Sequence, residues 1–139
     1  MPTLLNPRLG AHPIGYSIPL HDLLEEGFEP VPVVGHDTAV DRSWAVEQMR
    51  RCVEIVSGAR PAPRVDASVH RRVLASLRRD AGMRPELRGP QVVAVRFQAE
   101  PAVTRLAMAM TCGDRVVGVT GDFRRSARGG YQLTHFGVL

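Results

Sequence analysis

The sequence predicts one α+β domain, in which two helices pack on one face of a curved four-stranded antiparallel sheet. A proline-rich, extended N-terminal arm precedes this domain in the sequence. Three observations lead to this fold class. Apolar residues recur at helical intervals between residues 41 and 79, and at intervals of two between residues 91 and 139. The later segments are joined by short turns, which favours an antiparallel meander with helices covering its apolar face.

Residues 1–40 form the predicted arm. They contain six of the 11 prolines, and one Arg against five acidic residues, whereas residues 41–139 contain seventeen Arg against nine acidic residues. This division of charge favours binding over catalysis. All 18 basic residues are Arg, which a GC-rich genome explains, so only the placement of the arginines is informative.

One part of the arm, residues 19–28, has the pattern of a short helix. Pro19 suits a first helical position, and three leucines follow at i, i+3 and i+4. A helix this short is marginal in water, so we expect it to form only against a surface. The candidate binding residues of this motif are Leu20, Leu23, Leu24, Glu25, Glu26 and Phe28. Residues 30–35 predict an extended linker.

The first helix of the domain is predicted to begin at Thr38, because Thr38 and Asp41 match the [ST]-x-x-[DE] start signal. Gly58 is its predicted end. Its apolar stripe consists of Ala45, Met49, Cys52, Val53 and Val56. Cys52 and Cys112 lie in apolar patterns without metal-ligand spacing, which predicts two buried thiols in a reducing compartment.

The second helix is predicted to begin after Asp66 as N-cap. Its apolar face consists of Val69, Val73, Leu74 and Leu77. An arc of about 120° on the opposite side carries four arginines. No acidic residue occurs between 67 and 79, so these arginines lack a partner on their own helix. With three arginines of the loop 124–130 they form the candidate basic face, which is Arg71, Arg72, Arg78, Arg79, Arg124, Arg125 and Arg128.

Four strands follow. The predicted strands are residues 91–98, 102–112, 115–123 and a last one from Tyr131. Their predicted inward residues include Val93, Val95 and Phe97 in the first, Leu106, Met108, Met110 and Cys112 in the second, and Val117, Val119 and Phe123 in the third. Gly113 and Asp114 predict a two-residue type II′ hairpin turn.

No apolar run approaches the ~18 residues of a membrane span, and prolines interrupt any signal-peptide pattern, so a cytoplasmic protein is expected. The sequence has no phosphate-binding glycine loop with lysine, no Gly-x-Ser-x-Gly elbow and no His-Glu-x-x-His motif. We therefore expect no enzyme activity, no cofactor and no metal site.

Two segments, residues 53–61 (VEIVSGARP) and 129–134 (GGYQLT), resemble an actinobacterial conserved family of unknown function that is often encoded beside the preprotein translocase ATPase SecA. The resemblance covers about residues 41–139. Where that family usually opens its last strand with Trp, this chain has Tyr131. The resemblance implies a trimmed NTF2-like domain, a link to protein export or translation, and, by analogy, pairing into a homodimer.

The leading hypothesis is a non-enzymatic adaptor that binds a protein partner through the basic face and the arm motif, including docking of the acidic arm on the arginine helix. The first alternative is RNA or ribosome binding through phosphates, although base-stacking aromatics are scarce. The second is a small-ligand or isomerase-type cone. It requires a closed apolar cavity containing His135 or Asp122, and it fails if Phe97, Leu106 and Met108 fill that space.

Overall fold

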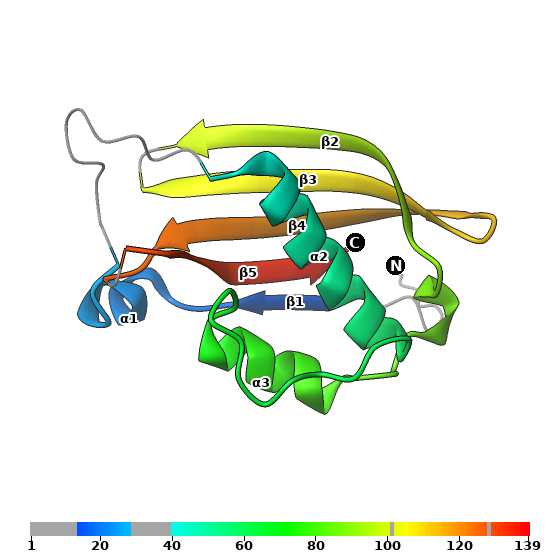
Figure 1. Ribbon diagram of the computed structural model, residues 1–139, viewed down its shortest axis with the longest axis horizontal. Coiled ribbons are helices and arrows are strands. Elements are labelled where there is room, and N and C mark those ends of the chain that lie inside the picture. Colours follow the sequence, from blue (N-terminus) through cyan, green and yellow to red (C-terminus); the bar gives the residue numbers. More distant parts are fainter. Residues whose placement is uncertain (1–13, 29–39, 101, 128) are drawn as a thin grey trace, which may run out of the picture.

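A computed structural model describes residues 14–28, 40–100, 102–127 and 129–139. The fold is α+β, with helices packed on one side of an antiparallel sheet of strand order β1-β5-β4-β3-β2 (Figure 1). The elements are β1 (Ile14–Ser17), α1 (Leu20–Glu25), α2 (Arg42–Ser57), α3 (Arg71–Arg79), the 3₁₀ turn η1 (Pro85–Leu87), β2 (Gln91–Glu100), β3 (Val103–Cys112), β4 (Arg115–Arg125) and β5 (Tyr131–Val138).

The four predicted strands are all present, and β1 adds a fifth that the sequence analysis did not predict. β1 lies within residues 1–40 and pairs antiparallel with the outer edge of β5, with Ser17 opposite His135. A strand of four residues has too few positions to show a period of two. Its pairing depends on a free sheet edge more than 100 residues away, which a local pattern does not reveal.

The helix predicted within residues 19–28 is present as α1, and it packs on the rest of the protein. Leu23 and Phe28 are buried, whereas Leu20 and Leu24 are exposed. The predicted linker at residues 30–35 and the predicted start signal at Thr38 lie outside the described residues.

Helix α2 has the predicted apolar stripe buried and ends at Gly58, which has a left-handed φ of 87°. Its N-cap is Asp41, whose side chain accepts a hydrogen bond from the backbone N–H of Trp44 at 2.8 Å. Met49 packs against the backbone at Gly121 of β4, where any larger residue would collide with it. This close approach fixes α2 on the sheet.

Helix α3 begins later than predicted, at Arg71, and its N-cap is His70 rather than Asp66. Asp66 instead accepts a hydrogen bond from the N–H of Ser68, which closes a turn. Val69 then forms a parallel bridge with Leu133 of β5, so this stretch is extended. Pairing with the sheet edge outweighs the helical pattern of the segment.

The predicted inward face of β2 is wrong in part, because a bulge between Val92 and Ala94 shifts the register. Val93 is 59% exposed, and Val92 packs against the core in its place. Phe97 also packs against the core, while Val95 is 39% exposed although it faces Met108.

All the predicted inward residues of β3 and β4, Cys112 among them, are buried. Gly113 has the positive φ, 65°, that the first position of a type II′ turn requires. Both cysteines are free and buried, and burial raises the pKa of the Cys52 thiol to about 12. Among the described residues, no helix is both long and apolar enough to cross a bilayer.

Leu106 and Met108 fill the space between helices and sheet. Asp122 and His135 lie on the opposite face, because buried Phe123 and Phe136 alternate with them along β4 and β5. Apolar side chains therefore fill the space in which a ligand cone was considered, and His135 and Asp122 lie outside it. The described residues argue against an apolar ligand cone containing either residue.

Candidate functional site

A groove lies where the end of α1, the segment 64–70, one side of α3 and the loop between β4 and β5 come together. Figure 1 shows α1 at the end of the sheet where β4 ends and β5 begins. The segment before α3 is fixed to this end by two backbone hydrogen bonds of 2.9 Å, from His70 N–H to Leu133 O and from Leu133 N–H to Ser68 O. The sheet edge thus sets the position at which α3 begins.

His70 connects α3 to α1 from a buried position. Its side chain is only 2% exposed, and its Nδ1 accepts a hydrogen bond of 3.0 Å from the backbone N–H of Arg72. A ring nitrogen that accepts carries no proton, so Nε2 carries the proton and donates to Glu26 Oε1 at 2.5 Å. The tautomer is assigned from this bonding pattern. His70 therefore caps α3 with one nitrogen and holds α1 with the other.

Charge pairs join the same two helices. Arg72 Nη1 lies 2.8 Å from Asp22 Oδ2, and Arg71 Nη2 lies 3.9 Å from Glu26 Oε2. The hydrogen bond from Arg72 lowers the pKa of Asp22, and the charges of His21 and Arg72 also lower it. The acidic helix of the N-terminal segment is thus docked on two of the four arginines of the predicted basic face.

The end of α1 also contacts the loop between β4 and β5. Gly27 has a φ of 97°, which favours glycine, and a Cβ added there would lie 2.7 Å from the Cβ of Ala127. This contact holds the end of α1 against the loop that lines the groove.

The groove has a volume of about 690 Å³ and an apolar floor made by Phe28, Val69 and Leu74, each at most 5% exposed. Ser126, Ala127, Gly130 and Gln132 line its far side. Three arginines, Arg64, Arg71 and Arg78, line the groove. None of the described residues forms an ion pair or a hydrogen bond with the guanidinium of Arg64 or Arg78. The groove therefore combines apolar surface with unpaired positive charge.

The structure distributes the seven predicted arginines instead of gathering them. Of the six that the structure describes, only Arg71 and Arg78 line the groove. Arg72 points to Asp22, and Arg79 Nε lies 3.5 Å from Asp80 Oδ1. Arg124 and Arg125 lie at the end of β4, which extends two residues beyond its predicted end, and not in the predicted loop. Arg124 is half-buried, and the guanidinium of Arg125 lies 5.8 Å from the ring centre of Tyr131. Arg128 lies outside the described residues.

The arm motif is also divided by the fold. Glu26 and Phe28 line the groove, and Leu23 is the buried residue of α1. Leu20, Leu24 and Glu25 face solvent. The two predicted sets of site residues therefore meet in part, through Glu26 and Phe28 on one side and Arg71 and Arg78 on the other.

Sequence reasoning missed Arg64 and His70. Arg64 lies between prolines and a short turn, where no periodicity assigns a side chain to a face. The sequence pattern places His70 inside a continuous helix, and its role as N-cap follows from the bridge between Val69 and Leu133. Neither residue carries a local signal of its position.

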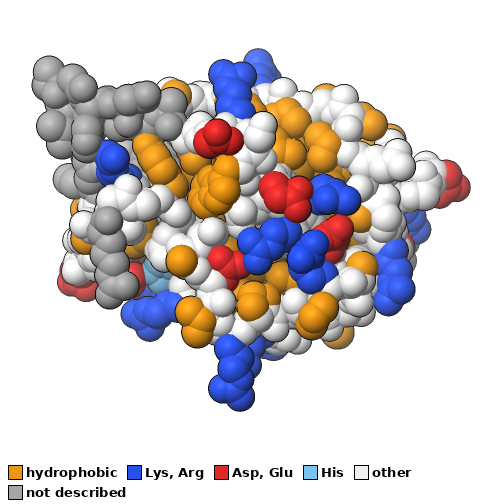
Figure 2. Space-filling model, in the orientation of Figure 1, with side chains coloured by type: hydrophobic (Ala, Val, Ile, Leu, Met, Phe, Trp, Pro, Cys, Tyr) orange, Lys and Arg blue, Asp and Glu red, His pale blue; other side chains and the backbone are white. Residues whose placement is uncertain are grey.

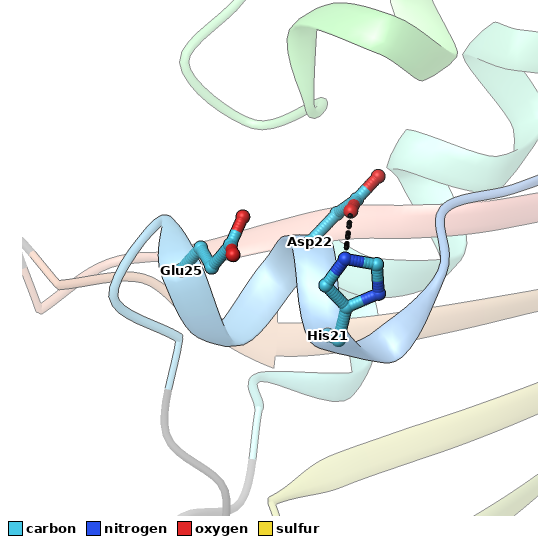
Figure 3. A group of neighbouring side chains, drawn as sticks. All are labelled: His21, Asp22 and Glu25. Carbon is cyan, nitrogen blue, oxygen red and sulfur yellow. Dashed lines mark ion pairs between the residues drawn. The ribbon is translucent and has the colours of Figure 1, made fainter.

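Three side chains of α1 could approach a metal ion together. The ligand atoms of His21, Asp22 and Glu25 lie within 4.8 Å of one another, and Figure 3 shows the His21 ring directed at Asp22. His21 Nε2 is 3.0 Å from Asp22 Oδ1, and Asp22 also binds Arg72. Because the group is largely exposed and its central carboxylate is already paired, we assign no metal to it.

Comparisons of this chain with protein-family models, curated proteins and solved structures find no match.

Proposed function

We propose that the protein is a non-enzymatic adaptor or regulatory domain of NTF2-like type that binds an acidic, partly apolar segment of a partner protein in the arginine-rimmed groove. The observation that supports this proposal is the pair of guanidiniums of Arg64 and Arg78 beside the apolar floor, neither of which has a partner among the described residues. Guanidiniums bind carboxylates through parallel hydrogen bonds, and buried apolar contacts add affinity.

Glu26 shows how the groove accommodates a carboxylate. One carboxylate oxygen accepts from His70 Nε2, and the other faces Arg71. Phe28 lies two residues further along and packs with its ring centre 6.0 Å from that of His70. An acidic residue followed by an apolar one is thus already seated at one end, and a partner segment with the same chemistry would extend along the groove.

RNA binding is the alternative, and the aromatic side chains argue against it. Single-stranded RNA is bound mostly by stacking bases on exposed aromatic rings. Among the described residues whose side-chain burial is known, every Phe, Tyr and Trp is buried or half-buried. The groove's apolar floor also favours a peptide over a phosphate backbone. The family resemblance implies a link to protein export, and a partner from the Sec export machinery and a homodimer are its specific expectations.

The test is fluorescence polarisation with labelled peptides that alternate Glu and Leu, compared with the same peptides carrying Gln in place of Glu. We expect the acidic peptide to bind and the Gln peptide to bind at least about tenfold more weakly, because two charged hydrogen bonds are lost. The double variant Arg64→Glu/Arg78→Glu is expected to abolish binding.

The matched control is Arg96→Glu/Arg115→Glu, which changes the net charge by the same amount at exposed positions away from the groove. Equal loss in both double variants would show that the peptide responds only to overall charge, which contradicts the proposal. Binding of a duplex RNA that falls steeply with salt, without peptide binding, would favour the RNA alternative.

A further inference from the structure

The face of the sheet opposite the helices carries a second hollow, of about 370 Å³. Strand register explains it. One row across the sheet has small side chains at its centre, because Ala107, Thr120, Gly137 and Gly15 lie side by side on β3, β4, β5 and β1. The row next to it is polar throughout and consists of Gln98, Arg105, Asp122, His135 and Ser17. The small row leaves space beside the polar row.

His135 stands between two hydroxyl groups in this hollow. Its Nδ1 lies 2.6 Å from Ser17 Oγ, and its Nε2 lies 3.3 Å from Thr120 Oγ1. A hydroxyl can donate or accept, so this pair of partners suits either protonation state of the ring. Both hydroxyls retain hydrogen-bonding capacity toward a bound molecule. Ser17 comes from β1, so the site is complete only when the N-terminal segment has joined the sheet.

The charges around the hollow leave one cation uncompensated. Arg105 pairs with Glu100 at 3.1 Å and with Asp122 at 3.5 Å. Burial lowers the pKa of Arg124, with the charge of Arg105 adding to this effect and that of Asp122 opposing it. Arg96 is exposed at the end of the small row, opposite Ala107, and no described residue pairs with its guanidinium. Both acidic groups near the hollow are already engaged by Arg105.

We propose that this hollow binds a small anionic molecule, whose carboxylate or phosphate group pairs with Arg96 while its polar end contacts Ser17, Thr120 and His135. The hollow is large enough for a small metabolite, since ligand sites start at roughly 300 Å³. Its polar lining disfavours a purely apolar ligand. The site lies on the other side of the sheet from the groove, so it does not depend on the partner-binding function.

The test is a titration followed by NMR of the ¹⁵N-labelled protein, with inorganic phosphate, phenyl phosphate, benzoate and neutral benzamide as probes. We expect the amide signals of Ala107, Thr120 and Gly137 to shift with at least one anion and not with benzamide. The ranking of phenyl phosphate against benzoate identifies which acid the site prefers. Inorganic phosphate shows whether the organic part contributes.

Two variants decide the assignment. Arg96→Gln is expected to weaken anion binding about tenfold or more, because a charged hydrogen-bonding partner is lost. Ala107→Leu is expected to block binding by filling the hollow, and the same spectra report whether each variant is folded. The matched control Arg115→Gln removes an exposed arginine that lines neither the hollow nor the groove and should leave the titration unchanged.

Several outcomes overturn the proposal: no shifts at millimolar anion, equal shifts with benzamide, or full binding by folded Arg96→Gln. These outcomes can be distinguished from failure of the proposal that the groove binds an acidic peptide. Arg64→Glu/Arg78→Glu loses only the acidic peptide if both proposals hold, and Arg96→Gln loses only the anion.

Discussion

The arginines of α2 and those around the groove have the same chemistry but different surroundings. Figure 2 shows acidic and basic side chains intermingled on the molecular surface in the view of Figure 1. On α2, Arg50 and Arg51 each pair with an acid, and Arg60 in the following loop binds Glu54 at 2.8 Å. Around the groove, Arg64 and Arg78 have no such partner among the described residues.

The comparison teaches that the number of arginines says little about binding, whereas their pairing is informative. A paired guanidinium gives up part of its capacity for a ligand and contributes to stability instead. An unpaired one beside apolar surface is free to bind. The following predictions separate these two roles.

The largest effect is expected at the floor of the groove. Phe28→Ala should lower the free energy of unfolding by about 3 kcal/mol, because a side chain only 5% exposed is removed from its packing. Urea denaturation measures it. Leu20→Ala, at a side chain 53% exposed on the same helix, is the control and should change stability by less than about 0.5 kcal/mol. Similar values for both would show that α1 does not pack as described.

A smaller loss is expected from the paired arginines of α2. Arg51 Nη2 lies 2.6 Å from Asp66 Oδ2, and Arg51 Nη1 lies 2.6 Å from Gln48 Oε1, with both partners partly buried. Arg51→Ala should therefore cost about 1–2 kcal/mol in unfolding free energy and leave acidic-peptide binding intact. If Arg51→Ala lost acidic-peptide binding without losing stability, Arg51 would have the binding role that is assigned to the groove arginines.

The link between α1 and α3 should respond to acid. Because the pKa of Asp22 is lowered in the folded protein, its pairing with Arg72 stabilises the fold above the ordinary value of 3.8, and this contribution is lost as the pH falls through the lower folded value. NMR titration of the Asp22 carboxyl measures the shift. Arg72→Gln should return the pKa toward 3.8, whereas Arg79→Gln should not change it. An unchanged pKa in Arg72→Gln would contradict the pairing.

The smallest effect on the free energy of unfolding is expected for the two groove arginines, whose loss should weaken peptide binding most. Arg64→Ala and Arg78→Ala should each change the free energy of unfolding by less than about 0.5 kcal/mol, since neither side chain has a described partner. Each should weaken acidic-peptide binding measured by polarisation. A destabilisation above about 1 kcal/mol would show that these arginines have a structural role.

The fold class and most of the core were predictable from local pattern. The stripe from Ala45 to Val56, the end of α2 at Gly58 and the alternation of β3 and β4 all follow from periodicity and turn chemistry. The predictions from local pattern are wrong where contacts with a segment distant in the sequence determine the local structure. The bulge at Val93 depends on pairing with β3, and the start of α3 depends on the bridge from Val69 to Leu133.

The candidate site was predictable only as two separate lists of residues. The sequence indicated that α3 carries arginines without local acids and that residues 19–28 carry acids and leucines without a surface. It did not show which of them meet. Glu26 reaches His70 across 44 positions in the chain, and Ser17 reaches His135 across 118.

By itself, then, the sequence determined the α+β class, the helical and strand periods and the division of charge, because these depend on neighbours within a few residues. Only the tertiary structure decided that Arg51 pairs with Asp66 while Arg64 and Arg78 have no partner among the described residues, and it placed β1 at the edge of β5. It also put His135 on the face of the sheet opposite the helices, beside Ser17 and Thr120. These features depend on register and packing between distant segments, where a shift of one residue moves a side chain to the other face of the sheet.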